Sequence, residues 1–318
     1  MTIKQSSVLR GLLERKKIVL RPLVCTALQA RMAEATGFEL VGISGAGSAA
    51  EIFGLPDAGL TTLTEMVENT QRICNAVNIP VIADCDTGYG NAINVRRTVQ
   101  LIIQAGAAGL FIEDQVAPKR CGFVKGKELI SIEEAVGKYR AAVDMRNELD
   151  RDVVITARTD ARTAVGGGME EVIRRVKAYK EEGGVDVIYV EAVQSREEIK
   201  KVRAAIDGPL TCSCQAIQPY PTLEELEQLG ICYTVGVGIS GVAHFALWNM
   251  LVAMKQQGLD PWIKWMAENK EHSVGEFQTF DLVGFPKIAE MEELYLPKEH
   301  LAKYNKSMGI YDPHHGKK

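Results

Sequence analysis

The chain has 318 residues, of which 46% are hydrophobic and 25% are charged, and its net charge is −4. This composition is typical of a globular protein, and the slight acidity argues against nucleic acid or an anionic membrane surface as a partner, because both attract basic patches. No apolar run is long enough to predict a membrane-spanning helix, and the polar start of the chain and the seven scattered cysteines favour a cytoplasmic protein with reduced thiols and no signal peptide.

Strand-like runs alternate with helical patterns along most of the chain. The predicted strands are 18–23, 39–44, 80–84, 109–113, 153–158, 185–191, 210–213 and 233–237, and the predicted helices are 6–16, 26–36, 61–77, 92–105, 131–148, 169–182, 196–206, 222–229 and 240–257. The strands are apolar on both faces, which is typical of a parallel sheet covered by helices. Eight repeats predict an α/β fold that closes into a (β/α)8 TIM barrel. An open doubly wound sheet is the alternative, although no G-x-G-x-x-G turn follows a strand.

The pattern changes after residue 258. Helices are predicted over 262–270 and 286–294, and the tail 312–318 is expected to be disordered. We therefore predict a barrel over 1–258 and a helical extension of the same domain over 259–318. Apolar helices outside a complete barrel need a surface to cover, and a neighbouring subunit is the natural candidate.

Several predicted strands end on a charged or hydroxyl side chain. These residues are Ser44, Asp84 with Asp86 just beyond it, Glu113, Arg158 and Glu191. In a barrel, the carboxyl ends of all strands open on one face, where active sites are built. One charged strand end is a common solvated terminus, but the convergence of five such ends predicts a functional site.

The acidic strand ends indicate a metal site. Asp84, Asp86 and Glu113 offer only hard oxygen ligands, which favour Mg²⁺, with Mn²⁺ possible, over zinc. The structural alternative is that the two aspartates cap the turn around Gly88 and Gly90. Two acids at a strand end can do both.

Two features favour a small anionic substrate. Arg158 suits a carboxylate or phosphonate, and Ser44, Gly45 and Gly47 can present backbone N–H groups to an anion. Beside a divalent cation, these groups fit a dianion chelated through a 2-oxo- or 2-hydroxycarboxylate.

The stretch Phe111–Gly126 carries a thiol next to two cations. Lys119, Arg120 and Cys121 follow one another in a polar loop after a buried strand. Neighbouring cations stabilise a thiolate, so we expect a lowered pKa for Cys121. Cys121 and Lys119 on a mobile loop could move a proton over an enolate, whereas the structural alternative is an incidental cysteine in a solvated loop.

Six motifs resemble those of the isocitrate lyase/phosphoenolpyruvate mutase superfamily over roughly residues 10–250. They are Ser44-Gly-Ala-Gly47, Leu55-Pro-Asp57, Asp84-Cys-Asp-Thr-Gly-Tyr-Gly90, Ala107-Ala-Gly-Leu-Phe-Ile-Glu-Asp-Gln115, Lys119-Arg-Cys-Gly122 and Ala157-Arg-Thr-Asp-Ala161. The Lys-Arg-Cys-Gly loop is similar to that of the methylisocitrate lyase, dimethylmalate lyase and carboxyphosphonoenolpyruvate mutase branch. The resemblance implies a TIM barrel whose last helix is swapped between subunits, in a homotetramer.

The resemblance also implies residue roles. Asp84 and Asp86 would bind Mg²⁺, with Glu113 and Asp57 in its water shell, and Cys121 would gate the site and protonate. Residues that would contact the substrate are Ser44, Gly45, Gly47, Asp57, Arg158, Glu191, Gly122, Phe123 and Ser213.

Two departures from the family pattern concern the distal half of the substrate. Phe123 stands where the lyases usually have histidine, and Ser213 and Ala216 stand near the positions of an asparagine and a glutamate. Both changes remove polar groups, which argues against isocitrate or methylisocitrate. We therefore expect a Mg²⁺-dependent carbon–carbon lyase acting on a 2-hydroxycarboxylate with a less polar distal half. The alternatives are a phosphonomutase, a 2-oxoacid hydrolase, an oxaloacetate decarboxylase, or a non-catalytic barrel that binds a metabolite.

Overall fold

The computed structural model describes residues 4–15, 17–275 and 277–314. The chain divides into two compact units, residues 1–240 and 241–318. The boundary falls at the start of the helix 240–257, whereas the sequence pattern places it after that helix.

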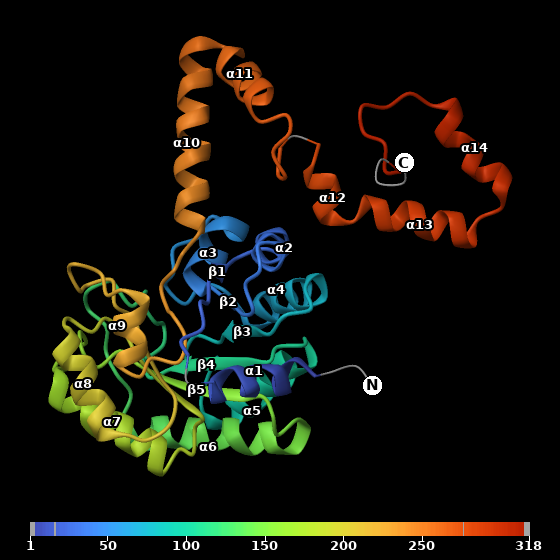
Figure 1. Ribbon diagram of the computed structural model, residues 1–318. Helices are drawn as coiled ribbons and strands as arrows, with labels where there is room; N and C mark the ends of the chain where they lie inside the picture. Colours follow the sequence, from blue (N-terminus) through green and yellow to red (C-terminus); the bar gives the residue numbers. More distant parts are fainter. Residues whose placement is uncertain (1–3, 16, 276, 315–318) are drawn as a thin grey trace. The chain divides into compact units, whose positions relative to one another are not determined.

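The first unit is built on a seven-stranded parallel sheet whose strands lie in chain order (Figure 1). The strands are β1 (Leu23–Val24), β2 (Val41–Ile43), β3 (Val81–Asp84), β4 (Gly109–Glu113), β5 (Val154–Thr159), β6 (Val187–Val190) and β7 (Leu210–Cys212). Pairing of Glu113 with Arg158 across β4 and β5 brings two of the predicted site residues side by side. The prediction of an α/β fold with a parallel sheet is confirmed.

A segment after β7 joins the two edges of the sheet. Single parallel bridges pair Leu210 with Ile231 and Ser213 with Val235 on one side, and Val19 with Tyr233 on the other. The predicted strands 18–23 and 233–237 are therefore present only as bridges and the short β1. The physical reason is local: Pro22 has no N–H to donate, and the Arg21 N–H donates to the Thr234 side chain (2.9 Å) instead of to a backbone carbonyl.

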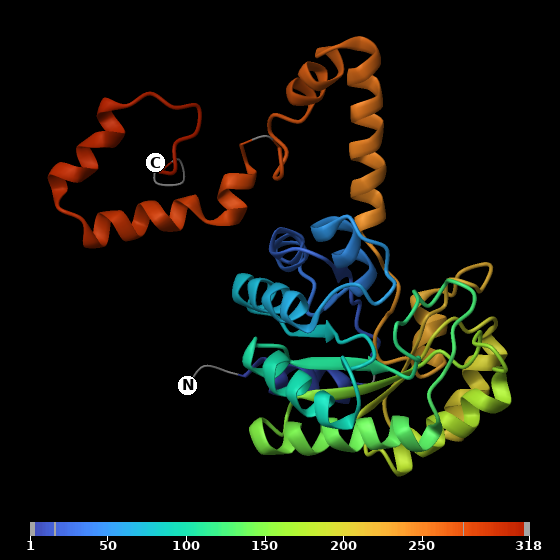
Figure 2. The ribbon, with the colours of Figure 1, turned by 180° about the vertical axis from the view of Figure 1, so that it is seen from behind.

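Helices surround the sheet, as both ribbon views show (Figures 1 and 2). They are α1 (Gln5–Glu14), α2 (Ala27–Ala35), α3 (Gly45–Phe53), α4 (Leu63–Ala76), α5 (Ala92–Gln104), α6 (Ile132–Leu149), α7 (Met169–Glu181), α8 (Arg196–Ala205) and α9 (Leu223–Gln228). Eight of them match predicted helices to within about two residues. Helix α3 was not predicted, because its glycine-rich first turn has the composition of a loop.

Alternate residues of each strand belong to two different apolar cores. Ile82 packs in a core with Val154 and Val187, whereas Ala83 and Ile155 pack in a larger core with the surrounding helices. This alternation follows from the two-residue period of a strand. The smaller core lies inside the curved sheet, as in a TIM-like barrel, and α1 contributes Leu9 and Leu12 to it.

The second unit is helical. Its helices are α10 (Ser240–Gln257), α11 (Asp260–Glu268), α12 (Thr279–Val283), α13 (Phe285–Tyr295) and α14 (Lys298–Lys306). Helices α12 and α14 were not predicted. In the tail that was expected to be disordered, Pro313 and His314 form a turn, and residues 315–318 lie outside the described part. Among the described helices, none has the length and apolar character needed to cross a membrane.

Candidate active site

A cavity of about 90 Å³ lies at the carboxyl ends of the strands in the first unit. Its lining includes ten of the predicted site residues: Ser44, Asp57, Asp84, Lys119, Cys121, Gly122, Phe123, Arg158, Glu191 and Ser213. Their convergence from the ends of five strands and from two loops is the arrangement that strand-end chemistry predicts for a barrel.

Four other predicted site residues stand outside this lining, namely Gly45, Gly47, Asp86 and Glu113. The two glycines form the first turn of α3. The Gly45 N–H donates to the Asp84 carboxylate (2.9 Å), and the Gly47 N–H donates to Ser44 Oγ (3.0 Å), which caps the helix. The protein's own oxygens thus engage the amides that the sequence assigned to a bound anion.

The acids of the site surround one lysine. Lys119 Nζ lies 2.5 Å from Asp57 Oδ1, 2.8 Å from Asp86 Oδ1 and 3.9 Å from Glu113 Oε1, and its side chain is buried. Burial alone would lower the pKa of Lys119, but the surrounding carboxylates raise it above its ordinary value. Burial and the neighbouring Asp84 raise the pKa of Asp86 to about 6. The ammonium group is therefore held as a cation among the acids.

This donor set fits a hard divalent cation. Asp57, Asp84, Asp86 and Glu113 supply only oxygens, and both Glu113 carboxylate oxygens are buried without a hydrogen-bond partner. Within the described residues, no three acidic, histidine or cysteine side chains yet converge as a ready metal-binding group. Lys119 lies at the centre of the acids instead, so a bound metal requires that its ammonium group withdraw.

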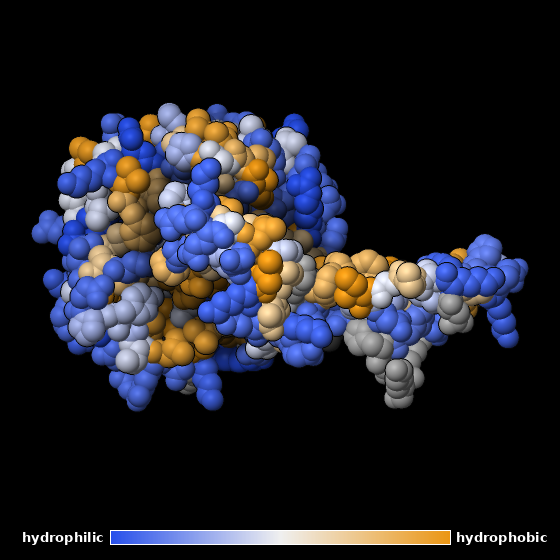
Figure 3. Space-filling model, turned by 90° about the horizontal axis from the view of Figure 1, so that it is seen from above, coloured by the Kyte–Doolittle hydropathy of each residue, from blue (hydrophilic) through white to orange (hydrophobic). Residues whose placement is uncertain are grey.

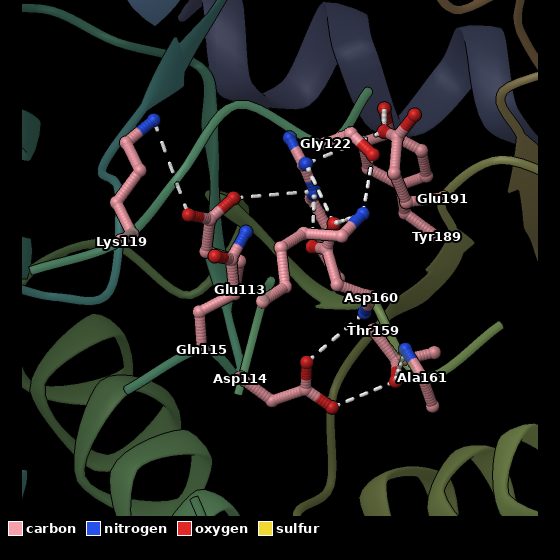
Figure 4. Close-up of polar contacts among 12 residues, drawn as sticks. Glu113, Asp114, Gln115, Lys119, Gly122, Thr159, Asp160, Ala161, Tyr189 and Glu191 are labelled. Carbon is pink, nitrogen blue, oxygen red and sulfur yellow. Dashed lines mark hydrogen bonds and ion pairs between the residues drawn. The ribbon is translucent and has the colours of Figure 1, made fainter. Parts of the chain in front are cut away.

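Three carboxylates surround Arg158 and balance its positive charge. Its Nε lies 2.9 Å from Asp160 Oδ2 and 3.3 Å from Glu113 Oε2, and its Nη2 lies 3.5 Å from Glu191 Oε2. The Tyr189 hydroxyl donates to Glu191, and Figure 4 shows Glu113, Asp160 and Glu191 around the same point. Arg158 is therefore fixed in orientation before any ligand binds.

A second layer behind the cavity was missed by the sequence interpretation. Asp114 accepts hydrogen bonds from Thr159 Oγ1 (2.7 Å) and from the Asp160 N–H (3.0 Å), as Figure 4 shows. It also accepts one from the Tyr179 hydroxyl (2.7 Å). Arg175 Nη1 also contacts Asp114, at 3.2 Å. This buried network ties β4 to the end of β5 and so positions Glu113 and Arg158. The consecutive acids Glu113 and Asp114 were the signal for this network in the sequence. Consecutive side chains at a strand end point to opposite faces, so only one of the two could face the cavity.

The loop 116–126 is fastened at several points. Gln115 exchanges two hydrogen bonds with the backbone of Arg120, both of 2.9 Å, and the Cys121 N–H donates to the Asp57 carbonyl (3.0 Å). Lys127 is buried and donates to the Gly122 carbonyl and to Asp160. Any Cβ at Gly122 would lie 2.6 Å from Arg158 Nη2, so only glycine lets the loop lie this close to the strand ends.

The expected lowering of the Cys121 pKa is wrong. Burial raises the pKa of this thiol, and Asp57 adds to the increase, while Arg158 and Lys119 oppose it too weakly. The charge of Lys119 is already engaged by three acids. The thiol therefore stays protonated at neutral pH, which suits a proton donor better than a nucleophile.

The cavity wall that is expected to face the distal half of the substrate has both apolar and polar side chains. Phe123 lines the cavity with 59% of its surface exposed. Ser213 Oγ donates to Gln215 Oε1 (2.7 Å), and Gln215 itself lines the cavity. The strand-seven segment thus presents the Gln215 amide to the cavity, a group that the sequence interpretation did not include.

The sequence interpretation also missed the cavity residues Arg21 and Tyr189. The signal for Arg21 was an arginine inside the apolar run 18–24.

Comparison with known proteins agrees with this geometry. The model of the phosphoenolpyruvate phosphomutase family matches residues 9–254. The chain is 39% identical over 300 residues to 2,3-dimethylmalate lyase of Eubacterium barkeri, an alignment that spans 90% of this chain and 96% of the relative. The crystal structure of a 2,3-dimethylmalate lyase, described as a PEP mutase/isocitrate lyase superfamily member, superposes with a TM-score of 0.84 at 30% identity, covering 98% of this chain and 100% of the other.

A second solved structure is that of phosphonopyruvate hydrolase in complex with oxalate and Mg²⁺. It superposes with a TM-score of 0.79 at 27% identity, covering 93% of this chain and 100% of the other. The matched family model spans more than half of the chain, and the cavity residues come from within the matched range. The chain belongs to the phosphoenolpyruvate phosphomutase family, within the PEP mutase/isocitrate lyase superfamily.

Proposed function

We propose that this protein is a Mg²⁺-dependent lyase that cleaves a carbon–carbon bond of a 2-hydroxycarboxylate and releases a 2-oxoacid. The observation that carries the proposal is the Cys121 thiol, which lines the cavity and has a raised pKa. A carbon–carbon lyase needs a proton donor for the carbanion that leaves. Phosphoryl transfer needs no proton on carbon, and in a decarboxylation the group that leaves is CO₂, so neither reaction releases a carbanion that must be protonated as it departs. The raised pKa keeps the proton on the thiol until the carbanion forms.

The residues that would hold the metal are Asp84 and Asp86, with Glu113 and Asp57 accepting from its water ligands. When bound, Mg²⁺ would stabilise negative charge on the 2-oxygen of the substrate. Support comes from the all-oxygen donor set, from the two buried Glu113 oxygens that accept no hydrogen bond, and from the relative that was solved with oxalate and Mg²⁺. Lys119 would swing out of the acid cluster as the metal enters and would then lie over the substrate.

The proton balance of the reaction is met by the side chains of the cavity. The substrate's 2-hydroxyl proton passes to a cavity carboxylate, and the O–H electron pair forms the new C=O bond. The carbon–carbon bond breaks, and its electron pair goes to the leaving carbon. The Cys121 S–H donates its proton to that carbon, while Arg158 holds the carboxylate of the 2-oxoacid half.

A dimethylmalate-like acid is the substrate class that fits best. Phe123 adds an apolar ring to the cavity wall, and the relative that aligns over 96% of its length is a 2,3-dimethylmalate lyase.

A panel of 2,3-dimethylmalate, methylisocitrate, isocitrate, phosphonopyruvate and oxaloacetate, with Mg²⁺ and with EDTA, tests the proposal. Release of pyruvate or glyoxylate from a 2-hydroxyacid supports it. Conversion of phosphonopyruvate to phosphoenolpyruvate, hydrolysis of phosphonopyruvate, decarboxylation alone or no turnover would replace it with the corresponding alternative.

Phe123→His should move substrate preference toward tricarboxylates. The imidazole restores a hydrogen-bond donor for a distal carboxylate, and a bond to a charged group is worth about a tenfold gain in relative kcat/KM or more. Val124→His adds an imidazole at the adjacent exposed position outside the cavity lining and should leave the preference unchanged. If the wild-type enzyme already cleaves methylisocitrate with kcat/KM near about 10⁴ M⁻¹s⁻¹ or above, Phe123 does not set specificity.

We also propose that the protein is a cytoplasmic homotetramer with helices swapped between subunits. Apolar side chains of α10 are exposed, among them Val242 (73%), Phe245 (69%), Leu247 (59%), Trp248 (69%) and Leu251 (55%). The space-filling view likewise shows apolar patches interrupting the polar surface (Figure 3). Exposed apolar surface of this extent is typical of subunit contacts.

Phe245→Asp combined with Trp248→Asp should reduce the assembly to smaller species in sedimentation velocity, because two charges would be buried at the contact. The exposed Gln256→Asp on the same helix adds one charge outside the apolar set and serves as the control. An unchanged sedimentation coefficient for the double variant would rule out α10 as the swapped helix.

A further inference from the structure

The cavity has two arginines on opposite walls, and only one of them is neutralised. Arg158 comes from β5 and is surrounded by three carboxylates. Arg21 lies just before β1. In the sheet order, β1 is four strands away from β5. Within the described part of the chain, no carboxylate forms an ion pair with Arg21. Its partners are the Thr234 carbonyl (3.2 Å from Nε) and the ring of Tyr233, whose centroid lies 4.8 Å from Cζ.

Arg21 is buried yet incompletely bonded. It is 1% exposed, it lines the cavity, and its Nη1 has no hydrogen-bond partner. A guanidinium carries its charge at physiological pH, and its burial without a counter-charge is costly. Such a group is stabilised when an anion enters the cavity.

The backbone is shaped to hold this guanidinium. Any Cβ at Gly42 would lie 2.5 Å from Arg21 Nη1, so the glycine on β2 provides the space that the arginine occupies. The neighbouring cavity residues Leu23, Ile43 and Val235 are apolar. An anion on this wall would therefore meet one cation beside apolar side chains, where an ion pair is less screened than in water.

We propose that Arg21 binds a second acidic group of the substrate, on the wall opposite the 2-oxoacid half held by Arg158. This inference rests on the proposed function, which places the 2-oxoacid half at Arg158. It specifies a dicarboxylate substrate whose second carboxylate points toward β1 and β2 and whose apolar substituents face Phe123. Arg21 is thus a specificity-determining residue, and it takes no part in proton transfer.

The test compares two probes in the full-length protein with Mg²⁺ by isothermal titration calorimetry. Pyruvate has one carboxylate, and 3,3-difluorooxaloacetate has two. Wild type should prefer the dicarboxylate, and Arg21→Gln should weaken its binding about 10- to 100-fold while pyruvate affinity stays the same. Arg21→Lys should retain part of the preference. Gly42→Ala should reduce the preference in the same direction without changing charge, because its methyl group displaces Nη1.

Arg146→Gln is the matched control. Arg146 is also buried, but it bonds to the Val153 carbonyl and to Asp186 away from the cavity, so its loss should lower stability and leave the probe preference intact. If Arg21→Gln changes both affinities equally, or neither, Arg21 has only a structural role and the inference fails. If Arg21→Gln does not fold, an unchanged preference in Gly42→Ala overturns it. Failure of both probes to bind wild type would instead overturn the proposed function and this inference with it.

Discussion

Asp84→Ala and Asp86→Ala are each expected to abolish Mg²⁺-dependent turnover, with kcat/KM at least about 100-fold below wild type. Loss of an outer-shell partner of a metal costs about 10- to 100-fold, and a direct ligand should cost more. Because Asp84 also accepts hydrogen bonds from the N–H groups of Gly45 and Asp86, Asp84→Asn is the safer variant for the fold. It retains an acceptor oxygen and lacks the charge. Calorimetric titration with Mg²⁺ and an activity assay give the two readouts.

The control for this prediction is Asp144→Asn, which removes an exposed acid on α6. It should leave both Mg²⁺ binding and turnover unchanged. Near-wild-type activity of Asp84→Asn or Asp86→Asn in the presence of EDTA would show that the acid cluster serves Lys119 alone and holds no catalytic metal.

Cys121→Ser should lower kcat by about 10²- to 10⁴-fold, the range expected when a general acid is lost. Serine retains the size of the side chain but is a far weaker acid than a thiol, so KM and Mg²⁺ affinity should change little. Cys74→Ser and Cys232→Ser, which lie outside the cavity lining, should have much smaller effects. If Cys121→Ser retains more than about half of the wild-type kcat, the thiol is not the donor and the mutase or decarboxylase alternatives gain support.

The ionisation of the same thiol gives an independent readout. A raised pKa means that the thiol is protonated at neutral pH. The reactive thiolate then forms only at a pH above the ordinary pKa of a cysteine. Inactivation of wild type by iodoacetamide should therefore be slow at pH 7 and still accelerating at pH 9. Fast, pH-independent alkylation near pH 7 would show a lowered pKa and would favour a nucleophilic role.

The α/β fold with its parallel sheet and most of the cavity residues could be predicted from the sequence. Local patterns are enough for this, because the two-residue period of strands and the caps of helices act over a few neighbours. Once the strands are known to be parallel, their carboxyl ends must share one face. Asp84, Arg158 and Glu191 could therefore be grouped without a structure. Strand limits were harder to predict where Pro22 interrupts the ladder near the edge of the sheet.

The electrostatics of the site could not be predicted from the sequence, because they depend on residues that come together only in the folded chain. The position of Lys119 among acids depends on Asp57, which is 62 residues earlier in the chain, so adjacency to Cys121 in sequence did not indicate which group the ammonium contacts. The direction of the Cys121 pKa depended on burial, which is a property of the folded loop. Arg21 gained its role from Gly42 on a neighbouring strand, because the space for a guanidinium is created by a side chain that the other strand lacks.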